Sequence, residues 1–279
     1  MHPAVKRSVS LAAILAAGTA GVTAAPCVVQ DGPTTPGTVN LPPRGCDYLS
    51  AGEAHIIIDG LPPGTTINVA PIHGSFLCGG GPYSSEGCEI PPPSASQPSS
   101  EIFFSTLVFN LTGTGSLAGL NCTLAIPGVE VEVHLDPRPV GDPDQTLNAE
   151  MVSLYGSTAM DMSCNLFQSL TVRAGSFQGL PTTAGMTRLL RRPNGKWQVD
   201  SFFDVFYSIQ FVGKPGGPLA GRSGTTTATE PVRMTAGSLS PSIPTLSQWG
   251  LISFMLVLLG GGALLVLHRR VPDGRARNG

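Results

Sequence analysis

The chain has few charged, aromatic or lysine residues for its length. Charged side chains make up 12% of its 279 residues, aromatic ones make up 6%, and the formal net charge is −2. Proteins that bind nucleic acid concentrate Lys and Arg along one face, and this chain has only three lysines. The composition therefore argues against a nucleic-acid partner. Two tryptophans and four tyrosines also leave few aromatic platforms for a glycan.

The common catalytic and zinc-binding motifs are also missing. The sequence has no Gly-x-Ser-x-Gly elbow, His-Glu-x-x-His pair, P-loop or Cys-x-x-Cys. Between the two chain ends the only histidines are His55, His73 and His134, and we interpret them as ordinary strand residues. We therefore expect no enzyme and no cofactor, with a secreted hydrolase as the least favoured class.

One group of carboxylates is a weak calcium candidate. Asp136, Asp142 and Asp144 fall in a turn-rich stretch, where carboxylate and carbonyl oxygens suit a hard cation. Their spacing does not match an EF-hand loop. The alternative is a solvated turn without metal, and we favour it.

The N-terminus has the order of features found in a secretory signal peptide. Lys6 and Arg7 precede an apolar run over residues 9–17, and small residues follow. Cleavage after Ala24 fits this pattern, while cleavage after Ala25 would leave Pro26 first. A membrane helix is the alternative, but the run is short and Ala-rich. We expect residues 1–24 to engage the Sec translocon and signal peptidase and then to be removed.

A second apolar run, residues 251–267, contains no charged residue. As a helix, its 17 residues span roughly 25 Å, near the lower limit for crossing hydrocarbon. Arg269 and Arg270 follow almost at once, and cationic flanks remain in the cytoplasm. The pattern predicts a transmembrane helix over 251–267 and a basic cytoplasmic tail over 268–279. The body of the protein then lies outside the inner membrane.

A short motif stands immediately before this run. Its six residues are Ile243, Pro244, Thr245, Leu246, Trp249 and Gly250. The proline keeps its neighbours extended, which suits a protease groove, and the tryptophan suits a water–lipid boundary. An ordinary Pro-containing linker is the alternative.

Residues 243–270 resemble the IPTL-CTERM sorting domain at all six of those positions. Such domains are processed by exosortases, which are membrane-embedded, cysteine transpeptidase-like enzymes of Gram-negative bacteria. The tail departs from the family by continuing for nine residues after Arg270. The resemblance implies an exosortase-type partner, a transient inner-membrane anchor and cleavage near residues 243–246. Residues 239–250 are then the stalk end and sorting motif.

Six cysteines follow the signal peptide, an even number that points to disulfides in an oxidising compartment. Six cysteines allow 15 complete pairings. Cys78 and Cys88 bracket a Gly-rich loop and form the best local pair. The pairs Cys27–Cys46 and Cys122–Cys164 then follow by elimination.

Short strand patterns separated by turns dominate the body. In the run 129–135 (VEVEVHL) aliphatic and polar residues alternate, which is typical of a half-buried strand. Other strands are predicted at 54–59, 66–70, 102–111, 150–155, 169–174, 186–191 and 201–212. No helical period of comparable length appears. The predicted fold is mainly β, an antiparallel β-sandwich with one C-terminal transmembrane helix.

The body divides into an irregular arm over 25–46, a first β module over 47–137 and a second over 147–238. Residues 67–76 resemble residues 170–177, and Phe103-Phe104 resembles Phe202-Phe203. These similarities favour two tandem modules, with chance likeness between strands as the alternative. Residues 213–242 are rich in Gly, Pro, Ser and Thr, which indicates a flexible stalk.

Charge is distributed unevenly along the body. Residues 27–161 hold 14 acidic residues against two arginines, whereas residues 162–242 hold three acidic residues against eight basic ones. Opposite charges can pack within one molecule or order molecules head to tail. A mosaic of solvated faces is the plainer alternative.

These patterns predict an exported protein of the cell surface or extracellular matrix with a structural or adhesive role. A module that binds surface glycans or another protein is the alternative. Trp197 follows a predicted hairpin turn and is either a ligand platform or a core residue.

Overall fold

A computed structural model describes residues 25–30, 36–50, 55–78, 88–158 and 164–237. These residues form fourteen β-strands and two short 3-10 turns, at Gly115–Leu117 and Ser176–Gln178. In the described ranges, no helix is long and apolar enough to cross a membrane. The predicted signal peptide, sorting motif, apolar run 251–267 and basic tail lie outside these ranges.

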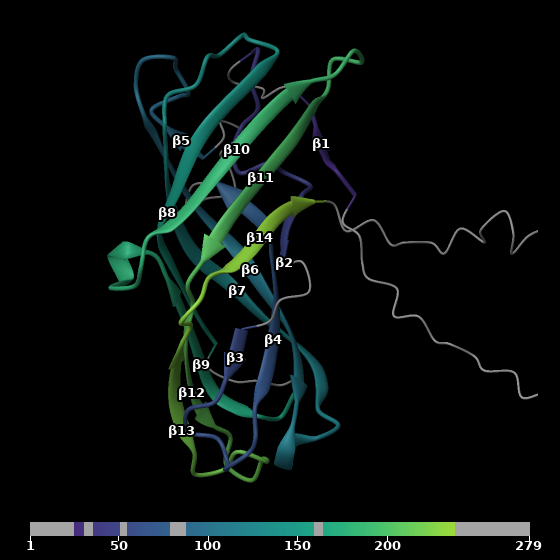
Figure 1. Cartoon of the computed structure of the whole chain (residues 1–279), viewed down its shortest axis with the longest axis vertical. Coiled ribbons are helices and arrows are strands. Elements are labelled where there is room, and N and C mark those ends of the chain that lie inside the picture. The colour runs from purple at the N-terminus through teal and green to yellow at the C-terminus, as the bar shows by residue number, and fades with distance from the viewer. Residues whose placement is uncertain (1–24, 31–35, 51–54, 79–87, 159–163, 238–279) are drawn as a thin grey trace, which may run out of the picture. The chain divides into compact units, whose positions relative to one another are not determined.

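Eight antiparallel strands close into a barrel, because each pairs with the next and the last pairs with the first (Figure 1). In order around the ring they are β2 (Asp47–Ser50), β4 (Ile67–Cys78), β6 (Ser99–Gly113), β7 (Asn121–Leu135), β8 (Asp144–Thr158), β10 (Thr183–Arg191), β11 (Trp197–Val205) and β14 (Val232–Gly237). The prediction of a mainly β, antiparallel fold is confirmed. The arrangement differs from a two-sheet sandwich, because all fourteen strands belong to one sheet. Closure removes the open edges that a sandwich would leave.

Six shorter strands pair with the members of this ring or with one another. They are β1 (Cys27–Val29), β3 (His55–Ile57), β5 (Glu89–Ile90), β9 (Phe167–Ala174), β12 (Ser208–Gly213) and β13 (Ser223–Thr227). β9 pairs with the far end of β8, β12 with β9, and β13 with β12. The Thr226 hydroxyl on β13 accepts the backbone N–H of Ile58 at 3.2 Å and of Asp59 at 3.0 Å, just past β3. These pairings extend the sheet from β8 beyond the eight strands of the ring.

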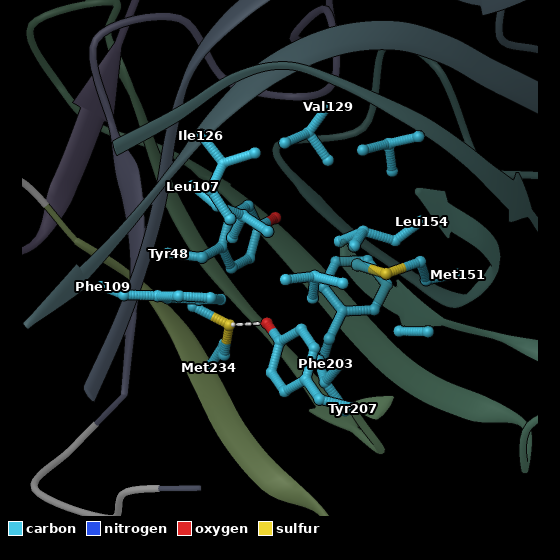
Figure 2. Packing of buried hydrophobic residues seen from close by; sticks show 14 of the residues in the cluster. Tyr48, Leu107, Phe109, Ile126, Val129, Met151, Leu154, Phe203, Tyr207 and Met234 are labelled. Atoms are coloured by element: carbon cyan, nitrogen blue, oxygen red, sulfur yellow. Dashed lines mark hydrogen bonds between the residues drawn. The ribbon is translucent and has the colours of Figure 1, made fainter. Parts of the chain in front are cut away.

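The alternating pattern of the sequence gives the barrel its interior. Val129, Val131, Val133 and Leu135 on β7 are buried, whereas Glu130 between them is exposed, as the sequence predicts. Buried residues from all eight ring strands join a single hydrophobic cluster, part of which is shown in Figure 2. In that view the Tyr207 hydroxyl points to the sulfur of Met234, its hydrogen-bond acceptor at 2.8 Å.

Residues 213–242 differ from the predicted flexible stalk. Within the described part of this segment, residues 223–227 form β13 and residues 232–237 form β14, a member of the closed ring. Val232, Met234 and Ala236 alternate inward, a period-2 pattern that the Ser- and Thr-rich composition obscured. The predicted strand 201–212 is in fact two strands, β11 and β12, which separate at residues 206–207.

The two predicted modules supply neighbouring arcs of one barrel. Strands β2, β4, β6 and β7 come from residues 47–137, whereas β10, β11, β14 and all of β8 except its first three residues come from residues 147–238. The proposed counterparts Phe76 and Phe177 differ in structure: Phe76 is buried within β4, and Phe177 is exposed on a 3-10 turn. The described parts of both ranges share one core.

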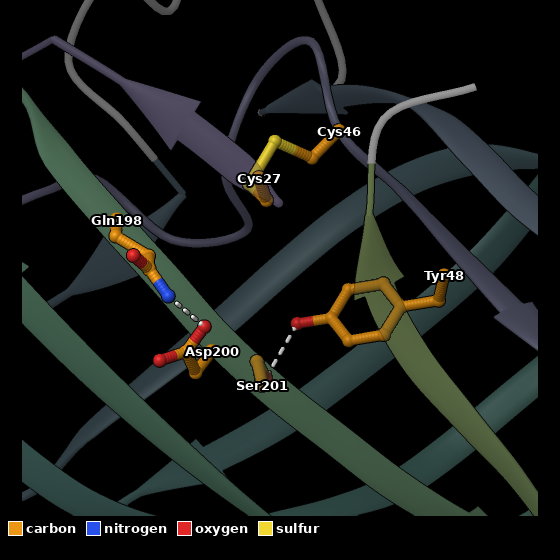
Figure 3. Close-up of a disulfide and its surroundings, with 6 residues drawn as sticks. All are labelled: Cys27, Cys46, Tyr48, Gln198, Asp200 and Ser201. Atoms are coloured by element: carbon orange, nitrogen blue, oxygen red, sulfur yellow. Dashed lines mark hydrogen bonds between the residues drawn. A yellow bond between two sulfur atoms is a disulfide. The ribbon is translucent and has the colours of Figure 1, made fainter. Parts of the chain in front are cut away.

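Three disulfides join the cysteine pairs favoured by the sequence: Cys27–Cys46, Cys78–Cys88 and Cys122–Cys164. The first ties β1 to the segment that leads into β2, beside the Tyr48–Ser201 hydrogen bond (Figure 3). The predicted irregular arm, residues 25–46, therefore contributes the short strand β1, which pairs with β11, and the disulfide links the two ends of the arm.

Candidate functional site

A group of polar side chains is buried inside the barrel at the end where β6 begins. Arg138, in the segment between β7 and β8, is 1% exposed. Its guanidinium donates to both carboxylate oxygens of Glu89 at 2.6 Å, to the Thr38 hydroxyl at 3.0 Å and to the Val39 carbonyl at 2.8 Å. This bidentate geometry is the strong form of an arginine–carboxylate pair. We call this region the polar end.

Irregular segments place these residues. The backbone N–H of Arg138 donates to the Ser94 carbonyl at 2.9 Å, which holds two non-strand segments together. Gln145, at the start of β8, donates to the carbonyls of Gly37 at 2.7 Å and Asp142 at 2.9 Å. Arg138 and Gln145 thus supply donors to loop carbonyls that have no strand partner.

Glu101 lies opposite Glu89 in the β5–β6 pairing and points into the same interior. It is 3% exposed, and its Oε1 atom has no hydrogen-bond partner. Burial raises the pKa of Glu101 well above its usual range, and the negative charge of Glu89 adds to this effect while Arg138 opposes it. The carboxyl is therefore held in its neutral form.

His73 on β4 is also buried, and its Nε2 atom lies 2.6 Å from the Ser105 hydroxyl on β6. Burial lowers the pKa of His73 to about 4, so the ring is neutral at physiological pH. A serine–histidine contact can activate a nucleophile, but both side chains here are sealed inside the barrel. The contact therefore acts as a buried cross-strand hydrogen bond.

A small cavity separates these polar groups from the apolar core. Its lining includes Tyr48, His73 and Glu101 together with the aromatic rings of Phe76 and Phe103. Its volume of about 10 Å³ is near the minimum that holds one water molecule. This cavity therefore has room for a solvent-sized molecule.

Trp197 is a core residue, which corrects the ligand-platform interpretation. Its ring is fully buried at the start of β11, with the guanidinium carbon of Arg191 5.9 Å from the ring centroid. Because no part of Trp197 is exposed, the indole offers no open face to a glycan. The hairpin turn predicted before it is present, with the N–H of Arg192 donating to the Lys196 carbonyl at 2.7 Å.

The three aspartates of the calcium candidate do not converge. Asp136 accepts from Asn148 at 2.8 Å, and the carboxylate of Asp144 forms a bidentate pair with Arg188. Among the residues that the structure describes, no three His, Cys, Asp or Glu side chains are grouped to hold a metal ion.

The predicted sorting residues Ile243 to Gly250 and the tail arginines Arg269 and Arg270 fall outside the described ranges, so they remain predictions. Sequence reasoning missed the polar end completely. A signal was present, since Glu101 has the same strand parity as the buried Phe103 and Leu107. Arg138 lies outside any strand, so strand alternation could not predict that its side chain is buried.

Comparison of the chain with protein-family models, with curated proteins and with solved structures gives no match.

Proposed function

We propose that the chain is an exported cell-surface or extracellular-matrix protein with a structural, non-enzymatic role. Its C-terminus would hold it in the inner membrane until an exosortase-type enzyme processes it. The observation that carries this proposal is the run Ile243-Pro244-Thr245-Leu246, two residues, then Trp249-Gly250, followed by an apolar stretch and arginines.

The described body agrees with export. Three disulfides suit an oxidising compartment. Covalent links and a closed sheet both restrict unfolding, which suits a protein that works outside the cell.

Mass spectrometry of protein recovered from the cell surface tests the proposal. We expect peptides that end near residues 243–246 and no peptide from residues 269–279. Replacing Pro244 and Trp249 with alanine should leave the C-terminus intact and keep the chain in the inner membrane. The matched control is Ser240→Ala, a small change just before the motif. Intact C-terminal peptides on most wild-type surface molecules would disprove processing.

A further inference from the structure

Exposed apolar side chains gather on one outer wall of the barrel. The described residues include ten exposed large hydrophobic side chains, and five lie over β4 to β8: Leu77, Ile90, Ile102, Tyr155 and Phe177. Leu77, Ile90 and Ile102 are each more than half exposed. Scattered apolar residues need no explanation, whereas a grouped patch is typical of a protein-interaction surface.

Strand pairing places these residues beside one another. Leu77 on β4 lies opposite Phe104 on β6, Phe104 opposite Glu130 on β7, and Glu130 opposite Tyr155 on β8. Two residues further along these strands, Ile102 on β6 lies opposite Glu132 on β7. Phe177 packs over the same wall, with its ring 5.8 Å from that of His134.

This wall is acidic as well as apolar. Strands β4 to β8 contain no lysine or arginine, while Glu130 and Glu132 project outward from β7. Arg173 on β9, opposite Tyr155, borders this wall. Glu132 lies 3.0 Å from His134, and Glu130 is exposed. We call the apolar residues above, with these two glutamates, the acidic wall.

The complementary charge lies on the other side of the ring. β11 is four strands from β6 in either direction around the eight-strand barrel. The turn between β10 and β11 carries Arg191, Arg192 and Lys196, all exposed, within six residues. In Figure 1 this hairpin extends upward beyond the ends of its neighbouring strands. We call residues 191–196 the basic tip.

We propose that the acidic wall is a docking surface for the basic tip of a second copy of this chain. Because wall and tip lie on different sides of the barrel, the contact is head to tail, and a pair of copies keeps one free wall and one free tip. Such heterologous contacts build open chains of molecules unless the rotation closes a ring.

The inference goes beyond the proposed function and can fail independently of it, since self-association is measured on the purified chain. Two charge-reversal variants are needed: Glu130→Lys with Glu132→Lys on the wall, and Arg192→Glu with Lys196→Glu on the tip. These four side chains lie on the outer surface, so thermal unfolding of both variants should match wild type. All chains are compared at full length in the same detergent, so the apolar run 251–267 contributes equally.

Sedimentation velocity at increasing protein concentration gives the test. Wild type should associate at about 0.01 M ionic strength, where charges are screened over ~30 Å. It should dissociate at about 1 M, where the screening length is only ~3 Å. Each variant alone should associate at least ~10-fold more weakly, because it sets like charges against each other. An equimolar mixture of the two variants should recover association, since the reversed wall then meets the reversed tip.

Three results would overturn the proposal. One is a wild-type chain that stays monomeric at both ionic strengths. Another is association that salt and charge reversal leave unchanged, which would assign it to a different surface. The third is a mixture of the two variants that remains monomeric, because the wall and the tip would then not contact each other.

Discussion

At the start of β6 the inward positions carry Ser99, Glu101, Phe103 and Ser105, whereas toward its other end they carry only apolar residues, Leu107, Phe109 and Leu111. One strand thus runs from the polar end of the interior to an apolar end. The apolar end is lined by further strands, including β3, β9 and β12, whose backbone groups are paired within the sheet. The polar end is closed by irregular segments.

This difference explains why charged groups are tolerated at only one end. An irregular segment brings carbonyls that no neighbouring strand satisfies, and a buried carbonyl without a donor costs free energy. Arg138 and Gln145 donate to the carbonyls of Val39, Gly37 and Asp142. At the apolar end the neutral Thr226 hydroxyl accepts the backbone N–H groups of Ile58 and Asp59, and side chains such as Phe109 and Phe211 fill the space.

The largest expected effect comes from removing Arg138. Arg138→Met would leave the Glu89 carboxylate buried without a countercharge, so the free energy of unfolding should fall by about 3–5 kcal/mol. Adding Glu89→Leu should recover part of that loss, because no charge then remains unpaired. Chemical denaturation with the disulfides intact measures both variants.

The control at the apolar end is Ile126→Val, which removes one buried methyl group and should cost about 0.5–1.5 kcal/mol. If Arg138→Met costs no more than this control, the ion pair does not stabilise the polar end. Equal stability of the single and double variants would contradict the unpaired-charge explanation.

His73 should make stability depend on pH, with an intermediate effect. Its pKa is about 4 in the fold and 6.5 when unperturbed, so the unfolded chain binds the extra proton between these values. Its contribution to stability is fully present above pH 6.5 and is lost as pH falls toward 4, by about 3 kcal/mol in total. In His73→Gln, the histidine's share of the loss of stability between pH 6.5 and pH 4 should be absent. A slope identical to that of wild type would show that the ring does not titrate on unfolding.

Glu101 should give a pH dependence of the opposite sign. A raised pKa keeps this carboxyl protonated in the fold, while the unfolded chain loses its proton above about pH 4.5. Wild-type stability should therefore fall as pH rises through that range, by at most ~1.4 kcal/mol per pH unit. Glu101→Gln keeps a neutral side chain of similar size, so unfolding curves from pH 4 to 8 should flatten. A steeper fall in the variant would reverse the assigned sign.

Local patterns in the sequence predicted most of the strands, although the structure lengthens several of them. The alternation over 129–135 located the second half of β7, and the run 102–111 located the middle of β6. The pairing of all six cysteines also followed from spacing and elimination. Strand β14 was missed because its Thr- and Gly-containing sequence reads as a linker until β2 and β11 pair with it.

The sequence by itself determined the β class of this protein, its even set of cysteines and the motif from Ile243 to Gly250 on which the sorting prediction rests. Tertiary structure alone decided that the sheet closes, that Trp197 is buried and that Arg138 meets Glu89 from 49 positions away. The physical reason is range: strand periodicity and turn chemistry act over a few residues, whereas closure, ion pairing and the apposition of outer side chains depend on which distant strands hydrogen-bond. The acidic wall is a product of that pairing, because only the β4–β6–β7–β8 register brings Leu77, Ile102 and Glu130 together.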